Sequence, residues 1–348
     1  MTMGANIIPV FEQLGLLEEF EKLSLPCLGV DFYRIDRKKL GIMDLKSRKP
    51  VTGYDSRIFA RPRLYELFRK QVPANKNSLN KKVDRMEEKD GKVFIHCSDD
   101  TVYEGDILVG ADGAYSGVRR SLYDQLDKMG LLPKEDPERM SIGYVTMVGV
   151  AGPQSPDKYP QLKDEFSHFS HMLRNDSSSW GVGSIADNQV CWFVSIQLSE
   201  AEAEEHQVRN SEWGPHANDT MLDLYRDKPC PWGSNMAEIF DATPKDMISK
   251  VFLEQKMFKT WFHSRTVFIG DACHKMLPGA GVGAVNALQD VVVLANCLFS
   301  MPDKPPDSIN SAFKSYCQQR FHRAAMEIER SNAMSKITAG QVKHQANP

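Results

Sequence analysis

The sequence lacks the features of secreted and membrane-spanning proteins. It has no run of about 18 apolar residues, the length that a helix needs to cross a bilayer. Its first residues show neither the basic stretch nor the apolar core of a secretory signal. We therefore expect a cytoplasmic protein with no transmembrane segment in this chain, and we leave open that a longer parent associates with membranes.

Paired cysteines and metal-ligand spacings are also missing. The seven cysteines are an odd number, they are widely spaced, and none form a C-x-x-C motif. This pattern is typical of reduced thiols in a cytosol-like compartment and not of a disulfide framework or a zinc site. His168 and His171 would point to opposite faces of a strand, with no third ligand nearby, so no metal site is predicted.

Neither sign of charge is in large excess. The chain has 43 Lys and Arg against 46 Asp and Glu, a net charge of −3, and its basic residues fall in short clusters. This distribution does not indicate a nucleic-acid surface, so no nucleic-acid partner is expected. The sequence also lacks G-x-S-x-G, H-E-x-x-H and Walker motifs, which disfavours the corresponding hydrolases and nucleotidases.

One stretch, residues 266–299, combines an apolar run, a glycine-rich loop and a helical pattern. The run from Thr266 to Ile269 stops at Gly270-Asp271, as expected of a strand buried on both faces of a parallel sheet. A helix is predicted after the loop, because apolar residues then recur at three- and four-residue steps: Ala287, Val291, Leu294, Ala295 and Leu298. Such a helix start offers free N–H groups to a ligand, and Asp271 could accept hydrogen bonds from sugar hydroxyls. Taken alone, the Gly-Asp pair is more typical of an ordinary turn.

Residues 105–120 repeat that organisation. A short apolar run breaks at Asp112-Gly113, and a helix is predicted from about Ser116. A carboxylate at a helix start ordinarily caps the helix. For this pair alone, capping is the simplest interpretation.

Together, the two stretches resemble the flavin-contacting motifs of the FAD-dependent monooxygenases built like p-hydroxybenzoate hydroxylase. The strings G-D-A-x-H, P-x-x-G-x-G and N-A-x-Q-D in residues 270–290 resemble the GD motif of that family. The string G-A-D-G-x-x-S-x-V-R in residues 110–119 resembles its DG motif. The resemblance extends from Gly4 to about Ser335. Val285, Ala280 and Val282 differ from the commoner residues, but they leave the P-x-x-G-x-G skeleton intact.

The resemblance implies a set of FAD-binding residues. They are Arg61, Asp112, Gly113, Asp271, Pro278, Gly281, Gly283 and Ala284. Within this set, Asp112 and Gly113 would lie near the phosphates, Asp271 near the ribityl or ribose hydroxyls, and Pro278 against the flavin ring. The backbone from Gly281 onward would stabilise negative charge on the reduced flavin.

Two further residues receive less definite roles from the resemblance. Arg61 would approach the pyrophosphate, although it is equally typical of a surface arginine. His274 is expected to form a structural hydrogen bond in preference to acid–base work. No catalytic side chain is assigned.

The implied activity is monooxygenation of an apolar, aromatic or terpenoid-type small molecule by hydroxylation or epoxidation. In the family, NADH or NADPH reduces FAD, and a flavin hydroperoxide formed with O₂ delivers one oxygen atom. The alternative is an FAD-dependent dehydrogenase or reductase on the same fold. The W-x-W-x-I-P signature of flavin halogenases is absent. The substrate, its oxidised position, the choice between NADH and NADPH, and the oligomeric state stay open.

The expected fold class is α/β, with an incomplete Rossmann-like FAD-binding domain interleaved with a mostly antiparallel substrate domain. We assign residues 1–30 and 57–140 to the FAD-binding domain, which resumes at 263–340 with the GD motif and the C-terminal helix. Residues 31–56 and 141–262 form the expected substrate domain.

The G-x-G-x-x-G unit that binds the ADP half of a dinucleotide is not found. It needs a βαβ unit of about 30 residues. Residues 181–186 and 279–284 imitate it, but the first follows the polar serines 177–179 and the second lies too far past its strand. The sequence therefore predicts an N-terminally truncated member with weak or no FAD retention. A non-enzymatic, FAD-deficient remnant is the alternative from another functional class.

The remaining pattern predicts a conventional set of elements. Helices are expected over residues 4–15, 57–73 (entered at Pro62), 200–212, 243–251 and 308–337, with a hairpin in 80–103, an antiparallel sheet in 142–198 and a frayed tail in 338–348.

Overall fold

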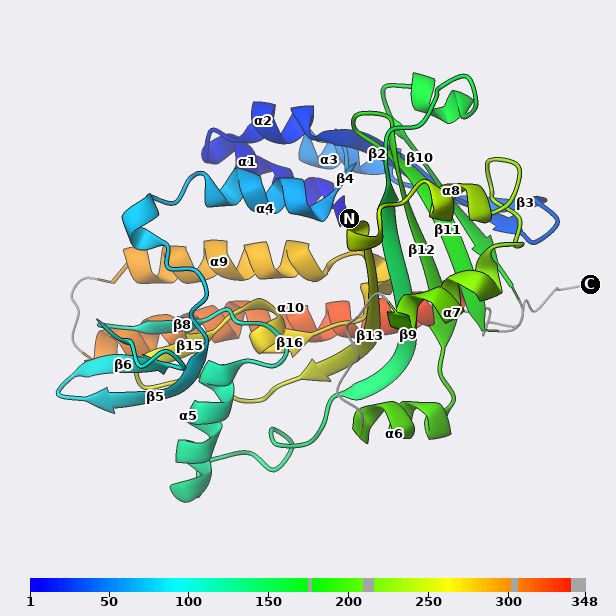
Figure 1. The fold of residues 1–348 in the computed structure, drawn as a ribbon. Helices are drawn as coiled ribbons and strands as arrows, with labels where there is room; N and C mark the ends of the chain where they lie inside the picture. Colours follow the sequence, from blue (N-terminus) through cyan, green and yellow to red (C-terminus); the bar gives the residue numbers. More distant parts are fainter. Residues whose placement is uncertain (175–176, 209–215, 302–305, 339–348) are drawn as a thin grey trace, which may run out of the picture. The chain divides into compact units, whose positions relative to one another are not determined.

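The computed structural model describes residues 1–174, 177–208, 216–301 and 306–338 (Figure 1). The chain divides into two compact units. Unit 1 comprises Met1–Gln71, Ile142–Leu253 and Ala333–Pro348, and unit 2 comprises Val72–Ser141 and Glu254–Asn332. Each unit is therefore built from segments that are distant in the sequence.

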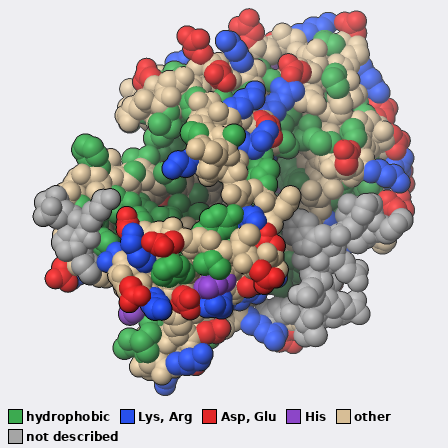
Figure 2. Space-filling view, turned by 60° about the vertical axis from the view of Figure 1, so that its left-hand side comes forward, with side chains coloured by type: hydrophobic (Ala, Val, Ile, Leu, Met, Phe, Trp, Pro, Cys, Tyr) green, Lys and Arg blue, Asp and Glu red, His purple; other side chains and the backbone are tan. Residues whose placement is uncertain are grey.

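The distribution of surface charge and the state of the cysteines are those expected from the composition. Acidic and basic side chains are interspersed on the face shown in Figure 2. All seven cysteines are free thiols. Within the described residues, we find no helix with the length and apolar character that crossing a membrane requires.

Unit 1 contains a large, mostly antiparallel sheet. In spatial order its strands are β1 (Thr2–Met3), β4 (Arg57–Phe59), β2 (Ser24–Arg34), β10 (Ser167–Leu173), β11 (Ser178–Ile185), β12 (Gln189–Gln197), β9 (Ser141–Ala151) and the first part of β13 (Ile248–Met257). Strand β3 (Lys39–Asp44) also pairs with β2. Strands β2 and β10 pair in parallel. The antiparallel sheet predicted in residues 142–198 is confirmed.

Short helices and turns accompany the sheet of unit 1. They are η1 (Ala5–Ile7), α1 (Ile8–Gln13), α2 (Leu17–Lys22), η2 (Lys46–Arg48), α3 (Lys49–Thr52), α4 (Arg61–Arg69), η4 (Pro160–Lys163), α6 (Glu200–Val208), α7 (His216–Tyr225), α8 (Ala237–Asp241) and η5 (Lys245–Met247).

One face of this sheet carries the main apolar core of unit 1. Trp180 and Trp192 are both buried there, with Met147, Met172 and Val194. Their indole N–H groups donate to the Pro229 carbonyl at 2.9 Å and to Thr243 Oγ1 at 2.9 Å. Both large side chains are thus buried without leaving a polar atom unsatisfied.

The glycines of the first motif look-alike lie inside strand β11. Every residue of this strand is buried, including Ser178 and Ser179. A Cβ added at Gly181 would lie 2.5 Å from the Ser170 carbonyl oxygen and 2.6 Å from the Phe193 ring. The rejection of this look-alike is confirmed. The reason given for it was wrong, because Ser178 and Ser179 belong to a buried strand, and the glycines there allow close packing.

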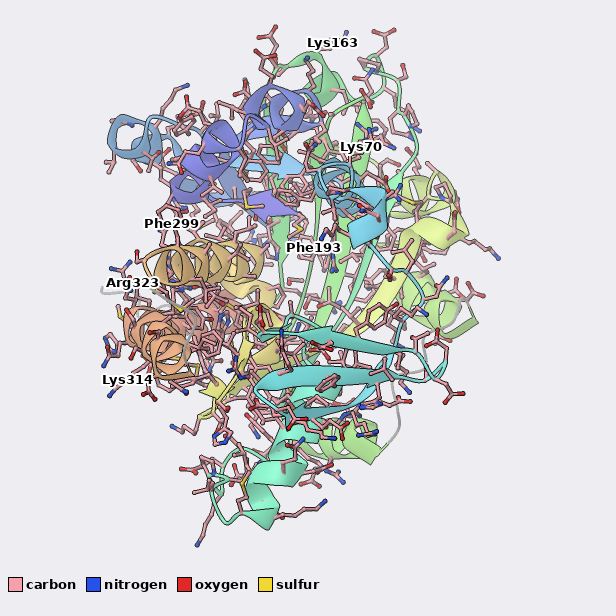
Figure 3. All side chains as sticks on the ribbon, turned by 90° about the vertical axis from the view of Figure 1, so that its left-hand side faces the viewer. Lys70, Lys163, Phe193, Phe299, Lys314 and Arg323 are labelled. Atoms are coloured by element: carbon pink, nitrogen blue, oxygen red, sulfur yellow. The ribbon has the colours of Figure 1, made fainter. Side chains whose placement is uncertain are left out.

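Unit 2 contains two small sheets and three long helices. The first sheet has the order β14 (Phe262–His263), β15 (Thr266–Phe268), β8 (Leu108–Gly110), and the second β5 (Val83–Lys89), β6 (Lys92–Cys97), β7 (Val102–Gly105). The helices are α5 (Gly117–Lys128), α9 (Gly283–Phe299) and α10 (Pro306–Thr338), and the residues of α10 from Ala333 onward belong to unit 1. Phe299, at the end of α9, is 91% exposed (Figure 3).

Short elements complete unit 2. These are η3 (Ala74–Lys76), η6 (Gly270–Ala272), β16 (His274–Lys275) and η7 (Pro278–Ala280), and the end of β13 (Ile248–Met257) pairs with β16.

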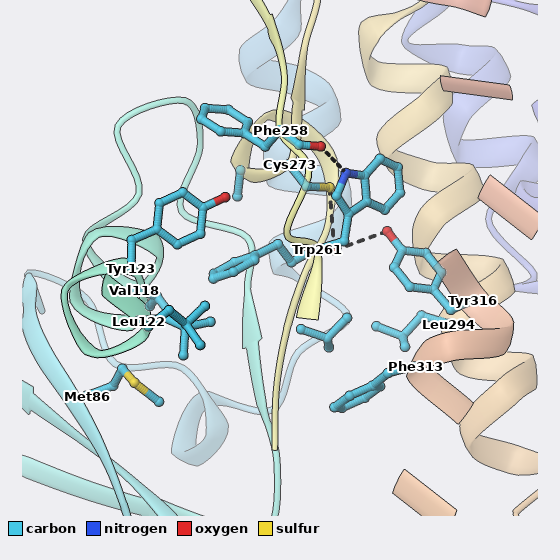
Figure 4. Close-up of a cluster of buried hydrophobic side chains, with 14 of the residues drawn as sticks. Met86, Val118, Leu122, Tyr123, Phe258, Trp261, Cys273, Leu294, Phe313 and Tyr316 are labelled. Atoms are coloured by element: carbon cyan, nitrogen blue, oxygen red, sulfur yellow. Dashed lines mark hydrogen bonds between the residues drawn. The ribbon is translucent and has the colours of Figure 1, made fainter. Parts of the chain in front are cut away.

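The core of unit 2 packs helix α10 against the strand before the glycine loop. Tyr316 and Trp261 lie in this buried cluster (Figure 4). Tyr316 donates its hydroxyl proton to the Phe268 carbonyl at 3.1 Å, and the Trp261 N–H donates to the Phe258 carbonyl at 3.0 Å. The cluster therefore fixes β15 from one side through both apolar and hydrogen-bonded contacts.

Two of the predicted elements need correction. The helix predicted over 243–251 is wrong, because η5 ends at Met247 and strand β13 follows; Ile248, Val251 and Phe252 favour a strand. Residues 57–59 form strand β4, so the helix predicted over 57–73 is restricted to α4 and starts at Arg61 itself. The end of the acidic helix (209–212) and most of the tail (339–348) lie outside the described residues.

Candidate functional site

Two neighbouring parallel strands of unit 2 deliver the two motif loops to one edge of their sheet. Gly110 of β8 pairs with Phe268 of β15, and the Ile269 N–H donates to the Gly110 carbonyl at 3.1 Å. A Cβ at Gly110 would lie 2.6 Å from the Phe268 ring, so only glycine permits this approach. Asp112 and Asp271 each follow the carboxyl end of one of these strands, where ligands bind in open α/β sheets.

Arg119 links the two loops. From the first turn of α5, its Nη1 donates to the Ala272 carbonyl at 2.7 Å, and its Nη2 donates to the Ala114 carbonyl. The guanidinium carbon lies 3.9 Å from the centre of the Phe258 ring, and the residue is buried. Burial lowers the pKa of this guanidinium. Arg119 ends the motif string in the sequence, but its linking role was not predicted.

Asp112 caps the start of α5, as its position in the sequence suggested. Its Oδ2 accepts a hydrogen bond from the Val118 N–H at 3.2 Å, while Ser116 Oγ accepts one from the Arg119 N–H at 2.8 Å. Gly113 has a φ of +83°, a value that favours glycine. Because Asp112 is exposed, its carboxylate can also accept hydrogen bonds from a ligand.

Asp271 carries a neighbouring positive charge. Its Oδ2 lies 2.5 Å from the ammonium nitrogen of Lys275, and both side chains are partly exposed, at 38% and 28%. The preceding Gly270 has a φ of +59° and donates its N–H to Asp290 Oδ2 at 2.8 Å. The loop therefore turns sharply at Gly270 and presents a carboxylate and an ammonium group side by side.

The start of helix α9 has backbone donors to offer. Gly281 has a φ of +67°, and Val282, at the N-cap position, makes no side-chain capping bond. The first turn of this 17-residue helix contains no acidic residue. Among the described residues, no side chain therefore caps the N–H groups of this helix start, which is the arrangement that binds anionic or electron-rich groups.

Helix α10 supports the loop before α9. Ser331 accepts a hydrogen bond from the Ala280 N–H at 3.3 Å and donates to the Leu277 carbonyl at 2.8 Å. Pro278, between them, is exposed. The hydrogen bonds of Ser331 thus fix the loop on both sides of Pro278 and leave Pro278 accessible.

A buried charged network lies behind the GD loop. Asp290 is 0% exposed and accepts hydrogen bonds from Arg320 Nε at 2.7 Å and from the Gly270 N–H. His274 Nε2 lies 2.5 Å from Asp290 Oδ2, so the predicted structural hydrogen bond of His274 is present. Arg320 also donates to Asn286 Oδ1 at 2.8 Å. Burial alone would raise the pKa of the Asp290 carboxyl, but the hydrogen bonds lower it below its ordinary value.

We assign this network to structure and not to a metal. The ligand atoms of Cys273, His274 and Asp290 lie within 4.8 Å of one another. However, the guanidinium of Arg320 already pairs with Asp290, and burial raises the pKa of the Cys273 thiol well above its usual value. A cation would therefore meet a positive charge and a protonated thiol.

Of the residues assigned to FAD, all except one belong to unit 2. Gly283 and Ala284 begin α9, and Asp112, Gly113, Asp271, Pro278 and Gly281 lie in the two loops. Arg61 belongs to unit 1, where it is the exposed first residue of α4.

The comparison with known proteins agrees with the motifs. The family model described as "FAD binding domain" matches residues 7–330. The chain is 28% identical to the FAD-dependent monooxygenase dpasE of Apiospora sacchari over 342 residues, which cover 95% of this chain and 68% of that protein. It is 25% identical to the FAD-dependent monooxygenase penE of Penicillium thymicola over 347 residues, covering 94% and 68%.

Solved structures give the same fold. HpxO of Klebsiella pneumoniae, complexed with FAD and uric acid, matches with a TM-score of 0.77 and 19% identity, over 98% of this chain and 79% of that chain. At this identity the likeness shows the fold, and it confirms the predicted α/β class.

Proposed function

This chain belongs to the FAD-binding-domain family of FAD-dependent monooxygenases, and from this we propose that the two loops of unit 2 hold FAD for the oxygenation of a small apolar or aromatic molecule. The observation that carries the proposal is the pairing of β8 with β15, since it brings Asp112 and Asp271 to the ends of neighbouring strands.

The residues present fit the cofactor. The start of α9 has backbone N–H groups without a side-chain cap among the described residues, and no acidic side chain in its first turn repels an electron-rich ring. A Cβ at Gly283 would have its nearest neighbour at 3.8 Å, so this glycine leaves space beside the backbone. Asp271 and Asp112 offer carboxylate oxygens that can accept hydrogen bonds from hydroxyl groups.

Each residue then has a separate binding role. Asp271, paired with Lys275, would bind ribityl or ribose hydroxyls, and Asp112 with Gly113 would lie near the phosphates. Pro278 would contact the flavin ring. The backbone from Gly281 through Gly283 to Ala284 would stabilise negative charge at the pyrimidine end. Arg61 would approach the pyrophosphate.

When bound, FAD supplies the redox chemistry, with NADH or NADPH as reductant and O₂ as the oxygen source. The chain itself needs no nucleophile or metal for this activity. Its own contribution is to bind and orient: Arg119 holds the two loops together, and the network around Asp290 fixes the turn at Gly270. We assign no catalytic side chain.

We also propose the functional division of the chain. Residues 1–30, 57–140 and 263–340 would serve FAD, and residues 31–56 and 141–262 would bind a small apolar, aromatic or terpenoid-type substrate that is hydroxylated or epoxidised. The seven free cysteines favour a reducing compartment, and on that basis we propose a cytoplasmic location.

A titration with FAD tests the cofactor site. The purified chain is mixed with increasing FAD, and quenching of flavin fluorescence is followed. We expect saturable binding that Asp271→Ala weakens about tenfold, or about 1.4 kcal/mol. The matched control is Asp223→Ala in unit 1, which should leave the affinity unchanged.

The outcomes separate the candidate functions. Saturable binding with the expected loss in the Asp271→Ala variant supports the proposed site, and NAD(P)H oxidation that rises with substrate supports the oxygenase. Absence of saturable FAD binding would overturn the proposal and favour the FAD-deficient remnant. NAD(P)H oxidation without oxygen incorporation from ¹⁸O₂ would favour the dehydrogenase or reductase alternative.

A further inference from the structure

A row of side chains crosses the sheet of unit 1 on the face opposite Trp180 and Trp192. In strand order it contains Phe32 of β2, His171 of β10, Gly181 of β11, Phe193 of β12 and Val148 of β9, each paired with the next. Paired residues point to the same face, so these five positions form one continuous line. Phe193 is labelled in Figure 3.

Aromatic rings surround the imidazole of His171. The ring centre of Phe193 lies 4.7 Å from that of His171, with the two planes nearly perpendicular at 87°. The ring centre of Phe32 lies 5.5 Å away on the neighbouring strand. Gly181, which lies between His171 and Phe193 in the row, has no side chain. The Phe193 ring occupies the space that a side chain at Gly181 would need. The row therefore presents flat apolar groups around one polar group.

The polar group of this row lacks a hydrogen bond. His171 is 8% exposed, and its Nε2 is buried with no hydrogen-bond partner among the described residues. Burial lowers the pKa of this imidazole to about 3, so the ring is neutral at physiological pH. A buried polar atom without a partner costs stability and calls for an explanation.

The two faces of the sheet differ in this respect. On the face of Trp180 and Trp192, both indole N–H groups have acceptors within the protein. On the face of His171, Val148 of β9 belongs to the row and is 39% exposed. The first face therefore satisfies the polar atoms of both tryptophans within the protein, whereas the second combines an unsatisfied nitrogen with an accessible apolar side chain.

We propose that His171 determines substrate specificity by hydrogen-bonding a hydroxyl group on a flat aromatic or polycyclic substrate, whose apolar body contacts Phe32 and Phe193. A hydroxyl group fits because it can either donate to the unprotonated nitrogen or accept from its N–H, so it satisfies Nε2 in both neutral tautomers. Aromatic rings favour a flat apolar ligand. The identification of this ligand as the substrate rests on the proposed function, whereas the binding itself does not.

Two probes of the same size test the proposal, 2-naphthol and naphthalene. Their binding to the full chain is measured by fluorescence titration without FAD, for the unchanged protein and for His171→Phe, which keeps a flat ring but removes Nε2. We expect His171→Phe to weaken 2-naphthol binding about tenfold, equivalent to about 1.4 kcal/mol, and to leave naphthalene binding within about twofold. His171→Leu serves as a second variant if the phenylalanine variant does not fold.

The control is His168→Gln on the same strand. His168 points to the other face and pairs with Asp164 at 2.6 Å, so its replacement should leave both affinities unchanged. Equal binding of 2-naphthol by the unchanged protein and by both His171 variants overturns the proposal, as does failure of 2-naphthol to bind the unchanged protein. Because these titrations contain no FAD, their result is independent of the cofactor titration, and either proposal can fail alone.

Discussion

The side chain of Arg119 forms hydrogen bonds with two loops at once. It satisfies the Ala272 and Ala114 carbonyls, which belong to the GD and DG loops. Loss of its hydrogen bonds should therefore both loosen the two loops and destabilise unit 2.

Replacing Arg119 by methionine should destabilise the protein and loosen the site. Methionine keeps much of the apolar stem but leaves both carbonyls without this donor, so we expect a loss of about 2–3 kcal/mol in the free energy of unfolding. Urea denaturation measures it, and FAD affinity should fall in parallel. The exposed neighbour supplies the control, Arg120→Met, with an expected change within about 0.5 kcal/mol. Equal stability of the two variants would contradict the linking role.

His171 should make stability fall in mild acid. Its pKa is about 3 in the folded protein against an ordinary 6.5, so below pH 6.5 the unfolded chain binds a proton that the folded chain does not. Stability from this group is therefore full above pH 6.5 and is lost as the pH falls toward 3. Relative to His171→Phe, we expect the protein to lose about 2 kcal/mol between pH 7 and pH 5.

Urea denaturation of both proteins at several pH values measures this difference, and the remaining titrating groups cancel in the comparison. A difference between the two proteins that stays constant from pH 7 to pH 5 would show that the imidazole is not kept neutral in the fold.

The sequence predicts single residues best where a motif spans a strand end. Asp112, Asp271 and Gly281 occupy the expected loops because apolar runs and glycines mark the ends of β8 and β15. Arg320 could not be predicted, because its partner Asp290 lies on another helix and an arginine in a long amphipathic helix looks like any surface residue. Such pairings depend on how α9 and α10 pack, which local spacing does not encode.

At the scale of elements, glycine has opposite meanings in β11 and in the loop before α9. Gly281 takes a positive φ and allows the chain to turn into a helix. Gly181 lies in a regular strand, and its lack of a side chain admits the Phe193 ring and the Ser170 carbonyl. A G-x-G pattern alone does not distinguish these uses, because the backbone angle and the neighbouring strand decide between them.

This difference predicts that Gly181→Ala destabilises the protein, because its Cβ would lie 2.5 Å from a backbone oxygen that cannot move independently. We expect a loss of about 1–3 kcal/mol in the free energy of unfolding. Gly143→Ala is the matched control, since Gly143 lies in strand β9 and its Cβ would have no neighbour within 4 Å. Urea denaturation compares the two variants, and similar values would refute the packing role.

Strand β13 shows why element type was mispredicted. Met247, Ile248 and Val251 have the spacing of one helix face, but a run this short is also compatible with a strand. The end of β13 pairs with β16 through Met257 and His274, so its extended form depends on a partner that comes later in the chain. Long periodic segments such as α10 leave no such ambiguity.

At the scale of the whole molecule, the two units illustrate what sequence order hides. Unit 1 and unit 2 each combine segments from both halves of the chain. The motifs nevertheless identified the family, because each motif is local to a strand, a loop and a helix start.

Hydrogen exchange with and without FAD tests how the cofactor site is distributed over the molecule. With FAD at ten times its Kd, amides that the cofactor covers should exchange about tenfold more slowly. We expect this protection in residues 110–119 and 270–286, because the helix start of α9 has N–H groups without a side-chain cap among the described residues. If Arg61 contacts FAD as proposed, amides at the start of α4 should also exchange more slowly.

Strands β11 and β12 provide the internal reference for this experiment, because no FAD-binding residue is assigned to them. The Asp271→Ala variant, at the same FAD concentration, should lose most of the protection in both loops, because its affinity is lower. Protection spread evenly over β11, β12 and the loops would indicate general stabilisation by FAD bound elsewhere. Protection of one loop without the other would contradict the shared site, since β8 and β15 are neighbours and Arg119 bonds both loops.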